Sequence, residues 1–175
     1  SDHFELGRIL IDQGKHEEAF EFFKFSTQIE IEKFGEEHPR IARSYYLIGM
    51  ELRFNEMFAT SITYLLKAME MDKRFFGENN IRIGRILQAL GSTYNDQGEY
   101  DMALEQYKKA LELKQLHLGI NHPEIEELYR NIGNTYFNQD MFEEAIDAYT
   151  KALNIAFKCR TPNHSAIGFL YTDIG

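Results

Sequence analysis

The sequence of 175 residues predicts an all-α fold in which pairs of antiparallel helices stack into a solenoid. A glycine recurs every 42 residues, at Gly7, Gly49, Gly91, Gly133 and Gly175, and each follows a leucine or an isoleucine. Between these glycines the apolar residues are spaced as on helices. The whole chain contains only three prolines, which leaves long helices uninterrupted. Because one helix pair cannot bury its apolar face alone, we expect the pairs to stack on one another.

Other positions of the repeat have a packing explanation. Small residues follow the glycine at the positions of Ala103 and Ala110 in the third copy, and a large residue stands between them at Tyr107. Small residues let two helices approach closely, and large ones fill the remaining gaps. We therefore interpret the repeated Phe and Tyr positions as core rather than as a cofactor site.

Each repeat is expected to contain a first helix, called the A helix, and a second, called the B helix. The A helices are predicted near residues 2–13, 40–54, 81–96, 123–138 and 164–175, and the B helices near 16–34, 57–76, 99–118 and 141–159. The repeats then span approximately residues 1–38, 39–80, 81–122 and 123–163 of a single array over 1–175, with a partial fifth repeat at 164–175.

The linkers between repeats carry a glycine and a His-Pro pair. Gly35 and Gly119 suit the left-handed αL position after a helix, and the prolines suit the first turn of the next one. We expect His38 and His122, each just before its proline, to cap that helix. The linker at 77–81 lacks His-Pro, and in the linker at 161–165 the proline has moved.

Composition excludes several classes of protein. The chain carries 19 basic and 28 acidic residues, a net charge of −9, which argues against nonspecific nucleic-acid binding. No apolar run approaches the roughly 20 residues of a membrane helix. The single cysteine, Cys159, excludes an internal disulfide. The first residues do not resemble a signal peptide, so we expect a soluble, cytoplasmic protein without nucleic-acid or membrane partners.

No catalytic or metal-binding motif is present in the sequence. His38, His122 and His164 share one linker position, at spacings of 84 and 42 residues, so a solenoid should separate them by a full repeat or more. There is no His-Glu-x-x-His motif, no phosphate-binding glycine loop and no nucleophile motif. Paired carboxylates such as Glu143 and Glu144 fall in the first turn of a B helix, where they favour the helix dipole. We therefore expect no enzyme activity, no cofactor and no metal.

Two tracts carry a family resemblance: Leu118-Gly-Ile-Asn-His-Pro-Glu-Ile and the following Asn131-Ile-Gly-Asn-Thr-Tyr. They resemble tetratricopeptide repeats, and the 42-residue period with its Gly-x-x-His-Pro linker is similar to the repeats of kinesin light chain. The resemblance implies a right-handed superhelix that serves as a protein-binding scaffold or adaptor. It also implies that the A helices line a concave groove and that the B helices face outward.

Binding should then fall to the A-helix residues that point away from the core. By the repeat register these stand six and three residues before each glycine, and one, four and five after it. In kinesin light chain repeats, an asparagine two residues before the glycine holds the cargo peptide, and Asn131 matches this position. The candidate peptide-binding residues are Arg8, Arg43, Tyr46, Met50, Arg53, Arg85, Gln88, Asn95, Arg130, Asn131, Asn134, Phe137 and Asn138.

Arginine and lysine are sorted between the two kinds of helix. The A-helix ranges contain arginines and no lysine, and residues 40–54 carry three Arg against one Glu. The middle of the groove should therefore be positive on an acidic body. A guanidinium matches a carboxylate, so the leading hypothesis is a partner peptide with acidic and apolar residues. The alternative is that these arginines pair with carboxylates of neighbouring repeats.

Two comparisons within the family narrow the hypothesis. Arg130 and Asn134 match two positions of a clamp for a C-terminal carboxylate, but Asp173 stands where that clamp needs a basic residue. We therefore do not expect a complete clamp. Of the positions two before the glycines, only Asn131 carries the asparagine of kinesin light chain, so kinesin cargo binding in particular is not expected.

A structural role is the alternative function. The repeats could be a rigid spacer, or a segment that self-associates through exposed terminal helices, in a larger scaffold or in a protein with a catalytic domain elsewhere. The last predicted helix presents Ile167, Leu170 and Ile174, which suit stacking on a further helix. We therefore expect the chain to be a piece of a longer array.

Overall fold

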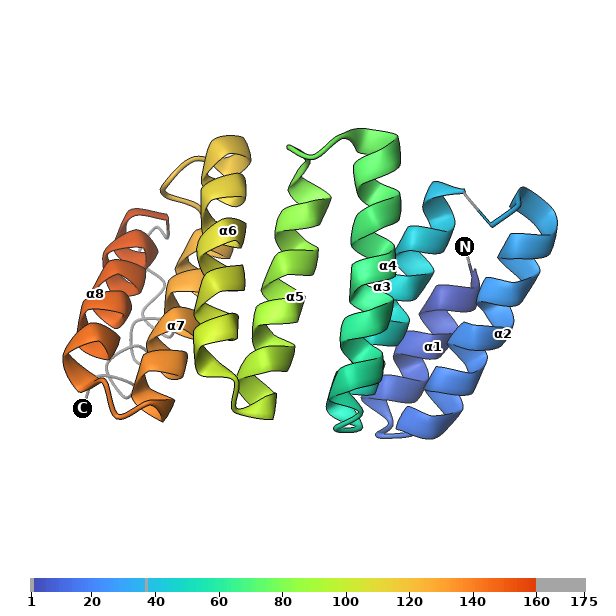
Figure 1. Cartoon of the computed structure of the whole chain (residues 1–175), viewed down its shortest axis with the longest axis horizontal. Helices are drawn as coiled ribbons and strands as arrows, with labels where there is room; N and C mark the ends of the chain where they lie inside the picture. Colours follow the sequence, from blue (N-terminus) through green and yellow to red (C-terminus); the bar gives the residue numbers. More distant parts are fainter. Residues whose placement is uncertain (1, 37, 160–175) are drawn as a thin grey trace. The chain divides into compact units, whose positions relative to one another are not determined.

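The computed structural model of the chain describes residues 2–36 and 38–159, excepting the side chains of residues 2–5 and 8. Within this part the regular structure is entirely helical (Figure 1). The helices are α1 (Asp2–Asp12), α2 (His16–Phe34), α3 (Pro39–Phe54), α4 (Phe58–Phe76), α5 (Ile81–Gln97), α6 (Tyr100–Leu118), α7 (Pro123–Asn138) and α8 (Phe142–Cys159). The predicted all-α fold is confirmed, and the predicted bounds of these helices differ from the observed ones by a residue at most. The predicted A helix at 164–175 lies outside the described residues.

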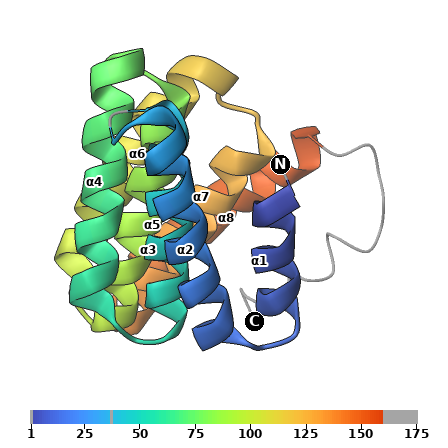
Figure 2. The ribbon, with the colours of Figure 1, turned by 90° about the vertical axis from the view of Figure 1, so that its right-hand side faces the viewer.

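The chain divides into two compact units, and the boundary between Ala89 and Leu90 falls inside α5. In the N-terminal unit α1 packs against α2, α2 against α3, and α3 against α4. Figure 2 shows α1 and α2 of this unit as a hairpin with a short turn. In the C-terminal unit α6 packs against α7 and α7 against α8. Contacts between successive helices are those of a helical repeat solenoid. A single array over residues 1–175 stays a prediction.

The repeated glycine lies where the two helices of a repeat approach each other closely. A Cβ atom built on Gly49 would lie 2.7 Å from Cγ of Leu65, and one on Gly133 would lie 2.6 Å from Cε1 of Tyr149. Both separations are far shorter than a carbon–carbon contact allows. The predicted close approach at the glycine is confirmed in both units.

Large residues of the repeat fill the core, as predicted. In the N-terminal unit Ala19, Phe23, Ile48 and Leu52 form one buried cluster between α2 and α3. In the C-terminal unit Tyr149 is only 6% exposed. The apolar faces of the helices are therefore buried against neighbouring helices, which is the main source of stability for such a fold.

The linker glycines differ from their prediction in one dihedral angle. Gly35, Gly77 and Gly119 have φ of 84°, 80° and 79°, as a left-handed residue should, but their ψ values are 160°, 169° and 168°. These angles lie in the extended left-handed region, not in αL, so the predicted αL conformation is wrong. A side chain is excluded from this region more strictly than from αL, and glycine is needed there.

The predicted histidine caps are confirmed. Nδ1 of His38 accepts a hydrogen bond from the backbone N–H of Arg40 at 3.2 Å, and Nδ1 of His122 accepts the equivalent bond at 3.1 Å. In the linker at 77–81, which lacks His-Pro, a different residue caps the next helix. There Oδ1 of Asn80 accepts from the backbone N–H of Arg82 at 2.8 Å. A different side chain therefore satisfies the same exposed donor at the start of α5.

Candidate peptide-binding site

The N-terminal unit contains a pocket of about 380 Å³ between α3, the end of α4 and the start of α5. Three of the predicted binding residues meet there, from two different A helices. The pocket is lined by Ala42, Arg43, Tyr46, Leu47, Asp72, Arg82, Arg85 and Ile86.

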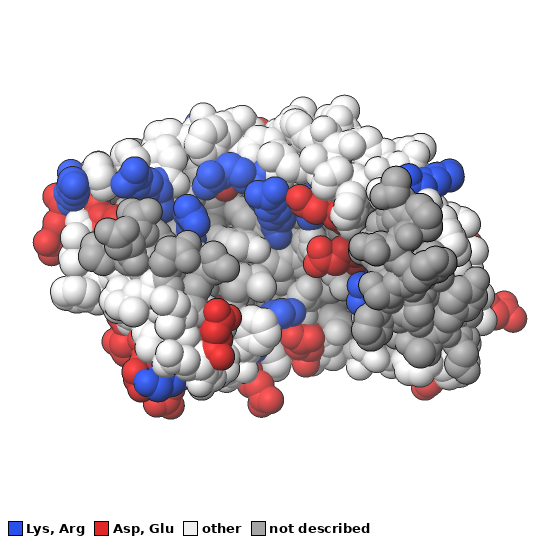
Figure 3. Space-filling model, turned by 180° about the vertical axis from the view of Figure 1, so that it is seen from behind, with Lys and Arg blue, Asp and Glu red and all other residues white. Residues whose placement is uncertain are grey.

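Helical spacing places the arginines of the pocket. Arg43 and Tyr46 lie three residues apart on α3, and Arg82 and Arg85 lie three apart on α5, so each pair shares one face of its helix. The three guanidiniums outnumber the single carboxylate of Asp72. Figure 3 shows basic side chains gathered in a row on the N-terminal unit, on the left of the picture. The lining is therefore positive although the chain as a whole is acidic.

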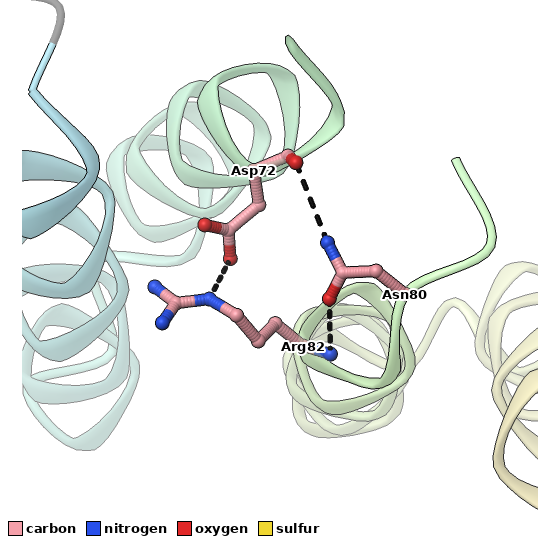
Figure 4. A network of polar contacts seen from close by, with 3 residues as sticks. All are labelled: Asp72, Asn80 and Arg82. Atoms are coloured by element: carbon pink, nitrogen blue, oxygen red, sulfur yellow. Dashed lines mark hydrogen bonds and ion pairs between the residues drawn. The ribbon is translucent and has the colours of Figure 1, made fainter. Parts of the chain in front are cut away.

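A polar network joins Asp72 and Arg82, two residues of the pocket lining, to Asn80 (Figure 4). Nε of Arg82 donates a hydrogen bond to Oδ2 of Asp72 at 2.9 Å. Nδ2 of Asn80 donates to the backbone carbonyl of Asp72 at 3.4 Å, while its Oδ1 caps α5. The network ties the last turns of α4 to the first turn of α5. The position of Arg82 is therefore fixed by both helices.

The environment of Arg82 differs from that of its carboxylate partner. The side chain of Asp72 is 3% exposed, whereas that of Arg82 is 38% exposed. The Arg82 guanidinium also lies 5.0 Å from the centre of the Phe76 ring. The negative face of an aromatic ring attracts a cation at this distance. Two contacts therefore restrict the guanidinium, which still borders the pocket.

Sequence reasoning missed Arg82 and Asp72. Arg82 stands nine residues before the repeated glycine, one helical turn ahead of the positions used for the prediction. Arg40 stands at the same position of the preceding repeat, so the repeat register carries a signal for both arginines. Asp72 lies on a B helix, and no signal in the sequence connects it with the A-helix face.

Other predicted residues of the N-terminal unit lie outside the lining of this pocket. Met50, Arg53 and Gln88 are half-buried. The Arg53 guanidinium lies 4.8 Å from the centre of the Phe54 ring. The side chain of Arg8 is outside the described part of the structure.

In the C-terminal unit, predicted amide residues form a network of their own. Oδ1 of Asn95 accepts hydrogen bonds from Oγ1 of Thr135 at 3.0 Å and from Nδ2 of Asn138 at 3.3 Å. These bonds connect α5 with α7. Phe137 is 55% exposed, and its ring packs edge-on against Phe142. This part of the A-helix face therefore presents amide and hydroxyl groups beside one exposed aromatic ring.

The remaining predicted residues lie along α7. Oδ1 of the exposed Asn134 accepts a hydrogen bond from the hydroxyl of Tyr149 at 2.6 Å. Nη1 of Arg130 lies 4.0 Å from Oε1 of the buried Glu126, so this arginine pairs within its own helix. Asn131 is half-buried. The alternative for the arginines was pairing with carboxylates of neighbouring repeats. Nε of Arg82 makes such a pair, with Asp72 of the preceding repeat.

Family models of the tetratricopeptide repeat match residues 2–74, 52–116 and 126–158. The chain therefore belongs to the tetratricopeptide repeat family. Repeats of this family act in general as protein–protein interaction modules, and their fold is typically a non-catalytic scaffold. No curated protein matches the chain in sequence.

Several solved structures are similar to this one. BtubC (BKLC) from P. vanneervenii is 25% identical, with a TM-score of 0.77 over 90% of this chain and 64% of that one. Nearly identical TPR-like repeats of a kinesin light chain-like protein from Podosopora anserina are 16% identical, with a TM-score of 0.82 over 99% of this chain and 82% of that one. RapI in its apo form is 18% identical, with a TM-score of 0.76 over 98% of this chain. The chain spans 64% of the BtubC chain and 46% of the RapI chain.

Two features are absent from the described residues. No helix there is long and apolar enough to cross a membrane. No group of three His, Cys, Asp or Glu side chains gathers within the same part of the chain in a way that could hold a metal ion.

Proposed function

We propose that the chain binds a partner segment carrying acidic side chains, and that the pocket of the N-terminal unit receives one of them. The observation that carries the proposal is the meeting of Arg43, Arg82 and Arg85 in one pocket. A guanidinium binds a carboxylate through two parallel hydrogen bonds, which gives strength and direction together. A partly enclosed site is also screened by salt less than an open surface.

Apolar surface accompanies the charge in the pocket. Tyr46, Leu47 and Ile86 lie beside the three arginines. Such a lining fits an acidic residue with an apolar neighbour, because the carboxylate meets the guanidiniums while the neighbour loses contact with water. The preferred partner is therefore acidic and apolar in alternation, not uniformly acidic.

The C-terminal unit adds contacts of a different chemistry to the proposal. The exposed side chains of Asn134 and Asn138 carry amide groups able to pair with the backbone of an extended peptide. Phe137 offers an exposed ring to an apolar side chain. We expect these residues to bind without regard to the charge of the partner.

Fluorescence anisotropy tests the proposal with a labelled, capped peptide rich in Glu and Leu, compared with the same peptide carrying Gln for every Glu. We expect the Glu peptide to bind more tightly, and Arg43→Glu or Arg85→Glu to weaken it about tenfold or more. Arg74→Glu is the matched control, because Arg74 is exposed on α4, outside the pocket lining, and undergoes the same change of charge.

Equal binding of the two peptides would refute the proposal, as would variants of Arg43 and Arg85 that bind like the native protein. Sedimentation at increasing concentration examines the alternative. Assembly of the chain with itself, together with no peptide binding, would favour a structural or self-associating segment.

A further inference from the structure

The ion pair between Asp72 and Arg82 recurs with its charges exchanged. Lys114 and Glu124 stand 42 residues later in the sequence, at the same two positions of the repeat. Nζ of Lys114 lies 3.0 Å from Oε2 of Glu124. The carboxylate is on the B helix in one pair and on the A helix in the other. Both junctions therefore contain an ion pair at the same two repeat positions, and each position carries an acidic residue in one pair and a basic residue in the other.

Burial is the same in both pairs, whatever the charge. The B-helix member is buried, with 3% exposure for Asp72 and 2% for Lys114. The A-helix member is partly exposed, with 38% for Arg82 and 26% for Glu124. The buried member pairs with a residue that is partly exposed, and the charge of that exposed residue sets the charge of the surface at the junction. In the N-terminal unit this sign is positive.

Arg82 keeps one edge of its guanidinium available. Nε is occupied by Asp72, and the ring of Phe76 faces the group at 5.0 Å. The terminal nitrogens point away from α5 and toward the side on which α3 lies (Figure 4). They make no hydrogen bond within the described part of the chain. A guanidinium held at Nε, with both terminal nitrogens directed at a pocket, has the geometry for a bidentate carboxylate.

We infer that Arg82 is the residue that binds the carboxylate of the partner's acidic side chain, and that Asp72 is its positioning residue. The inference rests on the proposed function and names the anchor of that site. Restriction by Asp72 and Phe76 lowers the entropy lost when the ligand binds, because one guanidinium orientation is already selected. Arg43 and Arg85 supply further positive charge around the same carboxylate.

A positioning role and a purely electrostatic role of Asp72 predict opposite effects of Asp72→Ala on peptide binding. If Asp72 acted only through its negative field, Asp72→Ala would strengthen the binding of an anion. If it positions Arg82, the same change weakens binding although the pocket becomes more positive. We expect weaker binding with Asp72→Ala, and a smaller loss with Asp72→Asn, which keeps an oxygen acceptor for Nε of Arg82.

The experiment measures binding of the capped Glu and Leu peptide to the full chain, with circular dichroism to verify folding. We expect Arg82→Gln to weaken binding about tenfold or more. We also expect Arg82→Lys to lose most of the affinity, since lysine keeps the charge but not the planar fork. Arg40→Gln is the matched control, because Arg40 has the same repeat position and stacks on Phe34 at 5.2 Å but does not line the pocket.

The double variant Asp72→Lys with Arg82→Glu copies the pair found at Lys114 and Glu124, so we expect it to fold. It should lose the preference for the Glu peptide over its Gln counterpart.

Three results would overturn the inference: Arg82→Gln or Arg82→Lys binding like the native protein, Asp72→Ala binding more tightly, or the double variant keeping its preference. If any of these occurs while Arg43→Glu still weakens binding, the proposed function stands and only the anchor is wrong. If the native chain does not prefer the Glu peptide, the proposed function fails first.

Discussion

Replacing Gly133 by alanine tests the close approach of α7 and α8. The added Cβ would lie 2.6 Å from Cε1 and 2.7 Å from Cδ1 of Tyr149. The tyrosine ring resists displacement because it is 6% exposed and its hydroxyl is bonded to Asn134 at 2.6 Å. Either the ring moves and its hydrogen bond weakens, or the two helices separate.

The expected cost follows from three opposing effects. Alanine is favoured over glycine inside a helix by about 1 kcal/mol. Inserting a methyl group into a close-packed core costs about 1–3 kcal/mol. Loss of the hydrogen bond between Tyr149 and Asn134 costs about 1 kcal/mol more. We therefore expect Gly133→Ala to lower the free energy of unfolding by about 2 kcal/mol.

Thermal unfolding followed by circular dichroism measures this loss, which corresponds to a Tm about 4–8 °C lower for a chain of this size. The control is Asn154→Ala, an exposed change on α8 that should alter stability by less than about 0.5 kcal/mol. In a Tyr149→Val background the ring is gone, and Gly133→Ala should become stabilising. A stabilising effect of Gly133→Ala in the native background would refute the steric argument.

Two further predictions concern charge and titration. Lys114→Leu should lower the free energy of unfolding by about 3 kcal/mol, because it removes the cation that lies 3.0 Å from the partly buried carboxylate of Glu124. Adding Glu124→Gln to the same chain should restore part of this free energy, as measured by urea denaturation. Burial, Tyr64 and Glu36 raise the pKa of Tyr45. The neutral phenol is thus favoured in the folded state, so this contribution to stability is full below pH about 10 and falls as pH rises through the higher folded pKa. The phenolate absorbance that develops above pH about 10 should be smaller in Tyr45→Phe than in the native chain, and an unchanged titration would contradict this.

The charge of the whole chain does not describe the surface that we propose to bind. The net charge is −9, yet the pocket of the N-terminal unit has three arginines and one carboxylate in its lining. The exchange of charges between the pair Asp72–Arg82 and the pair Lys114–Glu124 accounts for part of the difference between the pocket and the whole chain. The same repeat position carries Arg82 in one unit and Glu124 in the other. The charge that a partner meets is therefore set repeat by repeat.

The sequence by itself determined the helices, because local physics decides them. Period and apolar spacing predicted each described helix to within a residue, and the linker histidines were predicted to cap helices that they do cap. The need for a small residue at Gly49 and Gly133 was also evident, because glycine weakens a helix and its recurrence inside one indicates a close contact. The ψ values of the linker glycines were not predictable in this way, because both left-handed regions are open to glycine.

Only the tertiary structure decided which side chains meet. Arg43 and Arg85 were predicted as separate members of one face, and the fold brings them into one pocket with Asp72 of a B helix. The contact between Asp72 and Arg82 crosses from the end of one helix to the start of the next. Whether a charged side chain binds a neighbour or faces a pocket depends on distances of a few ångströms between helices. Repeat periodicity fixes the order of the helices and their inward faces, but packing between them sets these distances.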